Sequence, residues 1–277
     1  MKFCMNKEGG FHARCLIRFC LSFFLLGCVP SILLAEGPVW PTSSDAFSNL
    51  EDWPAYIQPT VSGNPASGLF GATRNKGSRF HEGIDIKSFK RDDQGVPRDR
   101  IHAVLGGRVA YVNRGSEAST YGRYLVIVHE RESLPVYSLY SHLASIDADL
   151  RVGDAVEAGA RLGIMGATSG GYRIPRSRAH LHFEMGLRLT DDFEAWYRQQ
   201  DFQEPNEHGL FNGMNLLGFP PLHYLMYARA RGKPDMLNYF RRAIKSDLTI
   251  RLRSKEVPDF VRRYPQLLDS PIPVEGV

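Results

Sequence analysis

The sequence predicts a mainly β domain, a sandwich or a barrel, followed by a short helical C-terminal extension. Between about residues 67 and 190, short runs rich in β-branched and aromatic residues alternate with Gly-containing turns, which is typical of all-β folds. The chain also has 26 Gly and 17 Pro among its 277 residues, which indicates many turns. After about residue 191 the runs become helical in pattern, which predicts the extension.

Individual elements follow from the same patterns. Strands are predicted at residues 108–112, 124–129, 136–140, 162–165 and 181–185. Short helices are predicted at residues 192–200, 224–231, 235–244 and 257–264, with prolines between them. Residues 36–66 contain five prolines and predict an irregular lead-in. The expected organisation is therefore an N-terminal segment at residues 1–35, the lead-in at 36–66, the β domain at 67–190 and the helical extension at 191–277.

Residues 1–35 have the pattern of a secretory signal peptide. Four cationic side chains precede or interrupt an apolar stretch that ends at Ala35, where cleavage is predicted. An uncleaved membrane anchor is the alternative, although the apolar stretch is shorter than the roughly 20 residues that a full span needs. A second alternative is lipidation at Cys28, which follows Leu25-Leu26-Gly27. The predicted location is outside the cytoplasm, in the periplasm or cell envelope or secreted, with membrane contact only through such an N-terminus.

Cysteine content and charge exclude several classes of function. All four cysteines precede Ala35, so the predicted mature chain has no disulfide, thiolate metal site or cysteine nucleophile. That chain has 30 basic and 29 acidic residues, which gives nucleic-acid binding no support. The extension is locally basic. It is either a solvated face or a contact for anionic wall polymers or a membrane surface.

A pair of histidines in a predicted strand carries the strongest chemical signal. His180 and His182 are two residues apart, so they share one face of the strand while Leu181 and Phe183 face the core. Two buried imidazoles side by side need partners, and both would repel if charged. Metal binding or proton transfer removes that problem.

A second cluster adds a carboxylate. His81 and Asp85 share a face in either a helix or a strand, and Gly83, Ile84 and Ile86 favour the strand. In the strand Glu82 points away, so it is not predicted to be a catalytic base. Two imidazoles and one carboxylate suit Zn²⁺ and leave a coordination position for water, whose pKa zinc lowers toward about 7. His142 and one of the His180/His182 pair then remain for proton transfer and oxyanion stabilisation.

These clusters resemble the signatures of the LytM/lysostaphin-type zinc metallopeptidases, peptidase family M23. The matching motifs are His81-x-x-x-Asp85, Tyr140-x-His142-Leu143 and His180-x-His182, and the resemblance covers about residues 67–188. It implies an antiparallel β-sandwich-like metallopeptidase domain. It also implies that His81, Asp85 and His182 bind Zn²⁺ and that His142 and His180 are catalytic. The implied substrates are the peptide stems and cross-links of bacterial peptidoglycan.

Two rival functions remain open, namely a non-catalytic wall-binding or amidase-activating module and a peptidase that acts on proteins. Degenerate members of the family lack zinc ligands, whereas this chain keeps all five positions. Residues 87–100 and 170–179 look enlarged relative to the family pattern. Arg173, Arg176 and Arg178 of the second loop either meet a substrate carboxylate or are simply solvated.

Overall fold

The computed structural model describes residues 37–44, 49–131, 134–233, 235–244 and 256–269. The predicted signal peptide and Cys28 lie outside these residues and stay predictions. The strands are β1 (Thr73–Arg74), β2 (Arg79–Phe80), β3 (Ile84–Lys87), β4 (Arg100–His102), β5 (Gly107–Asn113), β6 (Tyr124–Arg131), β7 (Leu134–Ser141), β8 (Leu143–Ile146), β9 (Ala155–Val156), β10 (Arg161–Met165), β11 (His180–Arg188) and β12 (Leu216–Phe219). The α-helices are α1 (Trp53–Tyr56), α2 (Phe193–Arg198), α3 (Pro221–Arg231), α4 (Met236–Asn238) and α5 (Asp259–Arg263).

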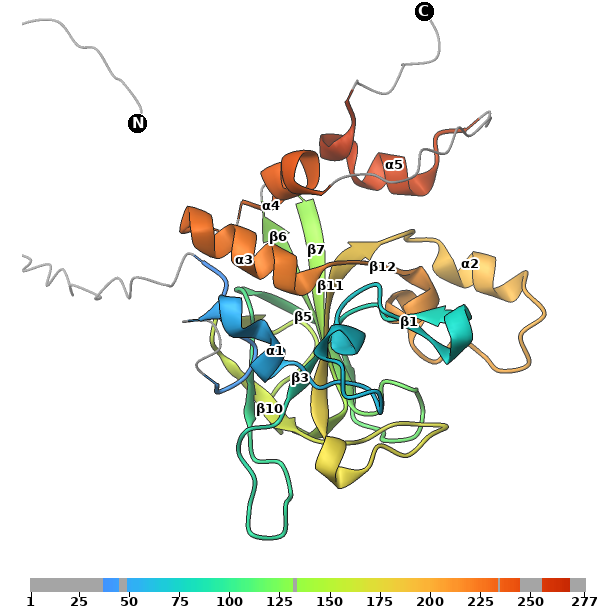
Figure 1. The fold of residues 1–277 in the computed structure, drawn as a ribbon. Helices are drawn as coiled ribbons and strands as arrows, with labels where there is room; N and C mark the ends of the chain where they lie inside the picture. Colours follow the sequence, from blue (N-terminus) through green and yellow to red (C-terminus); the bar gives the residue numbers. More distant parts are fainter. Residues whose placement is uncertain (1–36, 45–48, 132–133, 234, 245–255, 270–277) are drawn as a thin grey trace, which may run out of the picture. The chain divides into compact units, whose positions relative to one another are not determined.

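Most strands belong to one antiparallel sheet (Figure 1). Its order is β12-β11-β7-β6-β5-β9, and β3 also pairs with β11. A second sheet has the order β4-β10-β8, and β1 and β2 form a separate hairpin. The predicted mainly antiparallel β fold is therefore confirmed. All five predicted strands are present, with ends that differ by no more than a few residues.

The core explains why these runs form strands. Along β11, Leu181 and Phe183 are fully buried, and they belong to one core cluster with Leu125 and Ile127 of β6 and Leu134 and Val136 of β7. Ile84 and Ile86 of β3 belong to the same cluster. Burial of apolar residues on alternate positions fixes the register, because a slip of one residue would turn the whole set outward. The register in turn fixes where the polar residues of the same strands lie.

The C-terminal extension contains the predicted helices and also adds a strand to the main sheet. The helices predicted after residue 191 correspond to α2, α3, α4 with the π-turn that follows it, and α5. In addition, β12 pairs with β11 along residues 185–188 and forms one edge of the main sheet. The four residues of β12 are too few to show a period in the sequence. No helix among the described residues is long and apolar enough to cross a bilayer.

The lead-in also contacts the β domain. Ile57 is fully buried and forms an isolated β-bridge with Ile86. The Gln58 amide donates a hydrogen bond of 2.7 Å to the carbonyl oxygen of Asp85. Residues of the lead-in therefore lie directly beside β3.

Gly83 is required where β3 approaches β11. A Cβ at this position would clash with the carbonyl oxygen of Phe183 and would lie 2.9 Å from Cγ of Glu184. We expect Gly83→Ala to lower the free energy of unfolding by about 1–3 kcal/mol, as overpacking does, measured by denaturant unfolding. Gly106→Ala is the control, because its Cβ would meet no atom nearer than 3.5 Å. Equal stability of both variants would show that the strands can separate freely here.

Candidate metal and catalytic site

Strand β11 presents three polar residues on one face. His180, His182 and Glu184 alternate with buried Leu181 and Phe183, as the period of a strand requires. The predicted sharing of a face by the two histidines is confirmed. Glu184 extends the same row by one position, although the sequence reasoning gave it no role.

Strand pairing brings the carboxylate to the second histidine. Asp85 of β3 lies directly opposite His182 in the β3–β11 register. His81 precedes β3 and is not part of it, so the expected continuous strand from His81 to Asp85 is wrong. Instead His81 continues the β1–β2 hairpin: its amide donates to the Ala72 carbonyl oxygen at 3.0 Å, and its carbonyl accepts from Gly71 at 2.8 Å.

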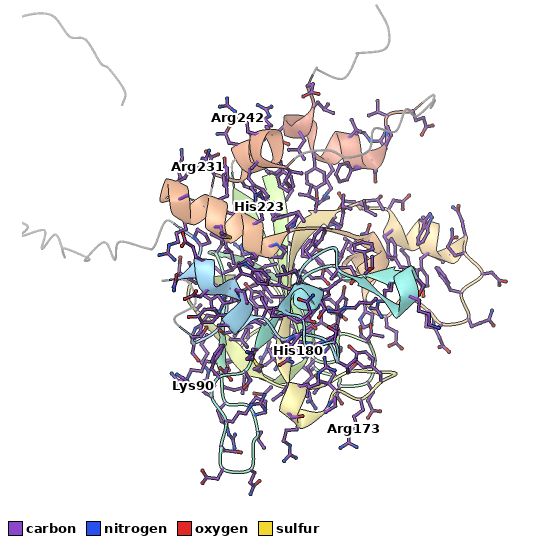
Figure 2. The ribbon with its side chains drawn as sticks, viewed as in Figure 1. Lys90, Arg173, His180, His223, Arg231 and Arg242 are labelled. Atoms are coloured by element: carbon purple, nitrogen blue, oxygen red, sulfur yellow. The ribbon has the colours of Figure 1, made fainter. Side chains whose placement is uncertain are left out.

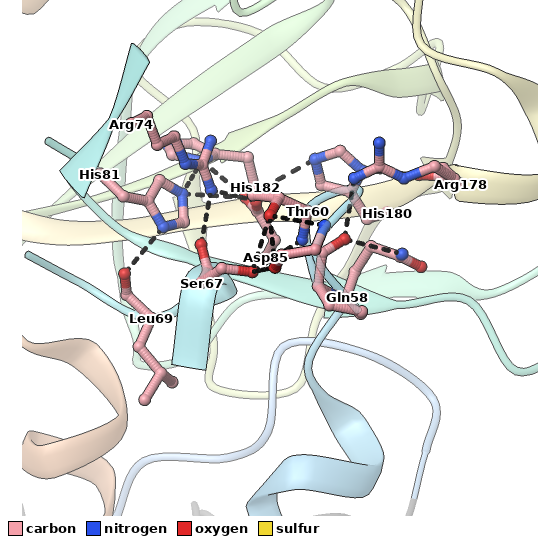
Figure 3. Close-up of polar contacts among 12 residues, drawn as sticks. Gln58, Thr60, Ser67, Leu69, Arg74, His81, Asp85, Arg178, His180 and His182 are labelled. Atoms are coloured by element: carbon pink, nitrogen blue, oxygen red, sulfur yellow. Dashed lines mark hydrogen bonds and ion pairs between the residues drawn. The ribbon is translucent and has the colours of Figure 1, made fainter. Parts of the chain in front are cut away.

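Three ligand atoms converge in this region (Figure 3). His81 Nε2 lies 2.9 Å from His182 Nδ1, and each of these nitrogens lies 3.0 Å from Asp85 Oδ1. Donors in a tetrahedral set about 2.0–2.1 Å from a zinc ion lie roughly 3.3–3.4 Å from one another. The triangle therefore needs to open by only about 0.4 Å to hold such an ion.

The outer hydrogen bonds of both imidazoles direct their lone pairs inward. His81 Nδ1–H donates to the Leu69 carbonyl oxygen at 3.0 Å. His182 Nε2–H donates to Glu184 Oε1 at 2.9 Å. Each acceptor fixes the tautomer, as partners of metal-bound histidines do. When both imidazoles are neutral, the two remaining nitrogens and Asp85 Oδ1 are acceptors that face one another, an arrangement that a bound cation would satisfy.

The pKa values of Asp85 and His182 describe the site without a metal. Burial tends to raise the pKa of Asp85, but His180, His81 and the hydrogen bonds from His182 and His81 outweigh it, and the pKa lies well below its usual value. Burial tends to lower the pKa of His182, but hydrogen bonds to Asp85 and Glu184 raise it to about 9. In the absence of a metal both ring nitrogens of His182 are therefore protonated at pH 7. A metal ion would have to displace the proton on Nδ1.

His142 and His180 lie beside the ligand triangle. Their ring centroids are 4.9 Å apart, and that of His142 is 5.9 Å from that of His182. His142 Nδ1–H donates to the Thr168 carbonyl oxygen at 2.8 Å, and His180 Nδ1–H donates to that of Arg178 at 2.8 Å. Nε2 of each ring is consequently the nitrogen available for proton transfer. His180 Nε2 is 3.6 Å from Asp85 Oδ1.

His142 has an unusual backbone conformation and a lowered side-chain pKa. It follows the last residue of β7 with a φ of 59°, a left-handed conformation that few non-glycine residues adopt. Burial, followed by the nearby His180 and His182, lowers the pKa of His142 well below its usual value. His142 is thus neutral at pH 7 and can accept a proton. Burial also lowers the pKa of His180.

Glu184 is the site residue that the sequence reasoning missed. Its Oε1 accepts the Tyr121 hydroxyl at 2.7 Å in addition to His182, and its Oε2 accepts the Tyr137 hydroxyl at 3.0 Å. Burial and the charge of Glu184 raise the pKa of both tyrosines, which keeps them protonated donors. The signal that could have found Glu184 was its position two residues after His182. Nothing in the sequence pointed to Tyr121.

We expect Glu184→Gln to weaken metal binding by about 10- to 100-fold, the usual cost of losing a partner of a metal-bound histidine. The uncharged amide keeps the shape of Glu184 but cannot accept all three of its hydrogen bonds. Competition with a chromophoric chelator measures the affinity. Glu130→Gln, at an exposed site on β6, is the control. Unchanged affinity in Glu184→Gln would mean that the orientation of His182 is fixed without this carboxylate.

A cavity of about 460 Å³ opens over the site. All five predicted residues line it. The other lining residues come from the lead-in, the β1–β2 hairpin, the β2–β3 and β5–β6 connections and the enlarged loop, namely Thr60, Arg74, Arg79, Glu82, Thr120, Tyr121, Tyr172, Arg173, Ile174, Pro175 and Arg178. Glu82 therefore borders the cavity, so the expectation that it points away is wrong. The reason is that residues 81–83 are not in a strand.

The enlarged loops contact each other. Arg91 donates to the carbonyl oxygen of Arg176 at 2.8 Å. Arg176 donates to the Gln94 carbonyl oxygen at 3.3 Å. Arg178 lines the cavity and donates to the Pro59 carbonyl oxygen at 2.8 Å. Arg173 also lines the cavity. Its side chain, labelled in Figure 2, is exposed. A substrate carboxylate as its partner stays a prediction.

Comparison with known proteins identifies the domain. The model of peptidase family M23 matches residues 79–192, a segment that contains all five predicted site residues. No curated protein sequence matches the chain significantly.

Several solved structures are similar to this chain. A zinc-containing peptidase from Vibrio cholerae is 23% identical, with 55% of this chain and 36% of that chain covered and a TM-score of 0.35. The catalytic domain of lysostaphin from Staphylococcus simulans is 18% identical, with 63% and 96% covered and a TM-score of 0.38. A putative glycyl-glycine endopeptidase LytM from Ruminococcus gnavus is 22% identical, with 54% and 47% covered and a TM-score of 0.33. The chain thus spans only about a third of the Vibrio protein. Residues 79–192, which are 114 of the 277 residues of the chain, are thus similar to peptidase family M23.

Proposed function

We propose that this protein is a zinc metalloendopeptidase that hydrolyses peptide cross-links of bacterial peptidoglycan outside the cytoplasm. The observation that carries the proposal is the convergence of three lone pairs, from His81, Asp85 and His182, beside two further histidines. The family assignment supports the same chemistry, since family M23 acts generally on peptidoglycan cross-links.

The donor set fits zinc rather than a hard cation. Two imidazole nitrogens and one carboxylate oxygen are ligands that Zn²⁺ prefers, whereas Ca²⁺ and Mg²⁺ prefer oxygen ligands throughout. When bound, zinc supplies Lewis-acid polarisation of a scissile carbonyl and lowers the pKa of a bound water. His81, Asp85 and His182 would hold it.

The protein's own residues supply proton transfer and positioning. The neutral Nε2 of His142 is placed to accept a proton from the attacking water and to return it to the leaving amine. His180, held by the Arg178 carbonyl oxygen, is placed to stabilise negative charge on the scissile carbonyl oxygen. The cavity of about 460 Å³ is lined by both rings, and the scissile peptide segment would bind there.

Digestion of purified peptidoglycan tests the proposal. We expect the zinc-loaded protein to release fragments with new amino termini, which mass spectrometry identifies together with the cleaved bond. Chelation should stop the release and added zinc should restore it. If the zinc-loaded protein leaves peptidoglycan intact but cuts unfolded proteins, the substrate part of the proposal is wrong.

The competing role is a non-catalytic module of the same fold. It predicts no bound zinc and no effect of chelation on function. The three candidate ligand atoms, which lie within 4.8 Å of one another, support the enzyme instead. The metal content of the purified protein distinguishes the two.

A further inference from the structure

The two carboxylate oxygens of Asp85 face different partners. Oδ1 points into the ligand triangle, 3.0 Å from His81 Nε2 and from His182 Nδ1. Oδ2 accepts a hydrogen bond of 2.7 Å from Nη2 of Arg74, which makes an ion pair (Figure 3). The Asp85 side chain is 7% exposed, so this ion pair is shielded from solvent on the carboxylate side.

Arg74 is held in place by the hairpin that also carries His81. It ends β1 and pairs with Arg79 of β2, and the backbone bonds of His81 to residues 71 and 72 continue the same ladder. Its Nη2 also donates to the Ser67 carbonyl oxygen at 3.3 Å. Arg74 precedes the segment that matches the family model, so the family assignment gives it no role.

A free carboxylate beside a zinc ion can bind through one oxygen or through both. Binding through both would fill a position that a catalytic site keeps open for water or substrate. An arginine bonded to one oxygen prevents this, because a charge-assisted hydrogen bond in a buried place is costly to break. The same guanidinium balances the carboxylate charge, so that more of the positive charge of the ion remains effective at the open position.

We propose that Arg74 is a positioning residue that holds Oδ2 of Asp85 and thereby restricts this ligand to a single metal bond through Oδ1. The inference rests on the proposed zinc function. Removal of the guanidinium frees Oδ2 to bind the metal, which raises the coordination number. Lysine in its place keeps a cation that can still bond Oδ2, although without the planar fork of arginine.

Cobalt substitution tests the inference without a peptidase assay. Four-coordinate Co²⁺ absorbs visible light several-fold more strongly than five- or six-coordinate Co²⁺. We expect the cobalt-loaded wild-type protein to show the strong visible absorption of four-coordinate Co²⁺. Cobalt-loaded Arg74→Gln should show the several-fold weaker absorption of a higher coordination number, with cobalt still bound. Arg74→Lys should recover most of the intensity. With zinc, Arg74→Gln should lower kcat by about 10- to 100-fold.

Arg98→Gln is the matched control. Arg98 makes an ion pair of the same 2.7 Å length with Asp92, in a loop that does not line the cavity, so the cobalt spectrum should not change. A wild-type spectrum in cobalt-loaded Arg74→Gln would overturn the inference and leave the proposed function intact. Equal weakening of the spectrum in Arg74→Lys and Arg74→Gln would also overturn it. Failure of the wild-type protein to bind any cobalt or zinc would instead overturn the proposed function.

Discussion

Replacing His182 by alanine is expected to remove the metal and the peptidase activity together. In the proposed site His182 is one of the three ligands that the described residues offer, and its Nδ1 lies within 3.0 Å of both other ligand atoms. Its loss leaves two ligands, too few for a stable zinc site. We expect the zinc content to fall from about one ion per chain to near zero and kcat/KM to fall by about a thousandfold or more, which is roughly 4 kcal/mol of transition-state stabilisation.

Elemental analysis of the dialysed protein and a peptidoglycan digestion assay measure the two effects. His223→Ala is the matched control, because His223 lies on α3 and its ring bonds Tyr239 at 3.1 Å rather than any ligand. Zinc retained at the wild-type level in His182→Ala would show that a different set of residues holds the ion.

Replacing His142 by alanine should give the opposite combination, a full metal site and little activity. His142 is not part of the ligand triangle, and its Nδ1 is bonded to the Thr168 carbonyl oxygen. Loss of a general base costs about 10²- to 10⁴-fold. We therefore expect kcat to fall by about that factor while the zinc content stays at about one ion per chain.

A second histidine with the same kind of backbone bond serves as control. His102 Nδ1 faces the Gly159 carbonyl oxygen at 2.9 Å, but His102 does not line the cavity. His102→Ala should therefore keep both zinc and kcat. If His142→Ala emptied the metal site, the division of roles between ligands and proton-transfer residues would be wrong.

The strands that form the site were predictable because they carry a clear period. In β11, buried Leu181 and Phe183 alternate with His180 and His182, and the alternation gave both the strand and the shared face. The motif spacing added the five site residues, and the structure brings all five to one cavity. Another histidine, His129, is buried outside this cavity, where its ring nitrogens bond Ser138 Oγ and the Gly106 carbonyl oxygen.

The remaining parts depend on contacts between distant segments, which leave no local pattern. Arg74 bonds Asp85, Glu184 bonds His182, and Tyr121 bonds Glu184. These residues come from a hairpin, a strand face and a loop whose relative positions only the folded sheet defines. Residues 81–83 do not form the expected strand, because the backbone of His81 bonds residues 71 and 72 beside the β1–β2 hairpin instead. Strand β12 was missed because four residues contain too little sequence to reveal a period.

The pairing of β3 with β11 joins Asp85 and His182, two residues of the proposed metal site that are 97 residues apart in the chain. Such non-local pairs form only after a long loop has closed, so the site cannot exist in a largely unfolded chain. Metal should accordingly bind the native state and hardly the denatured one. At a free zinc concentration one hundred times its Kd, this preference would add about 2.7 kcal/mol to the unfolding free energy. The thermal midpoint of the protein would thus rise with zinc concentration.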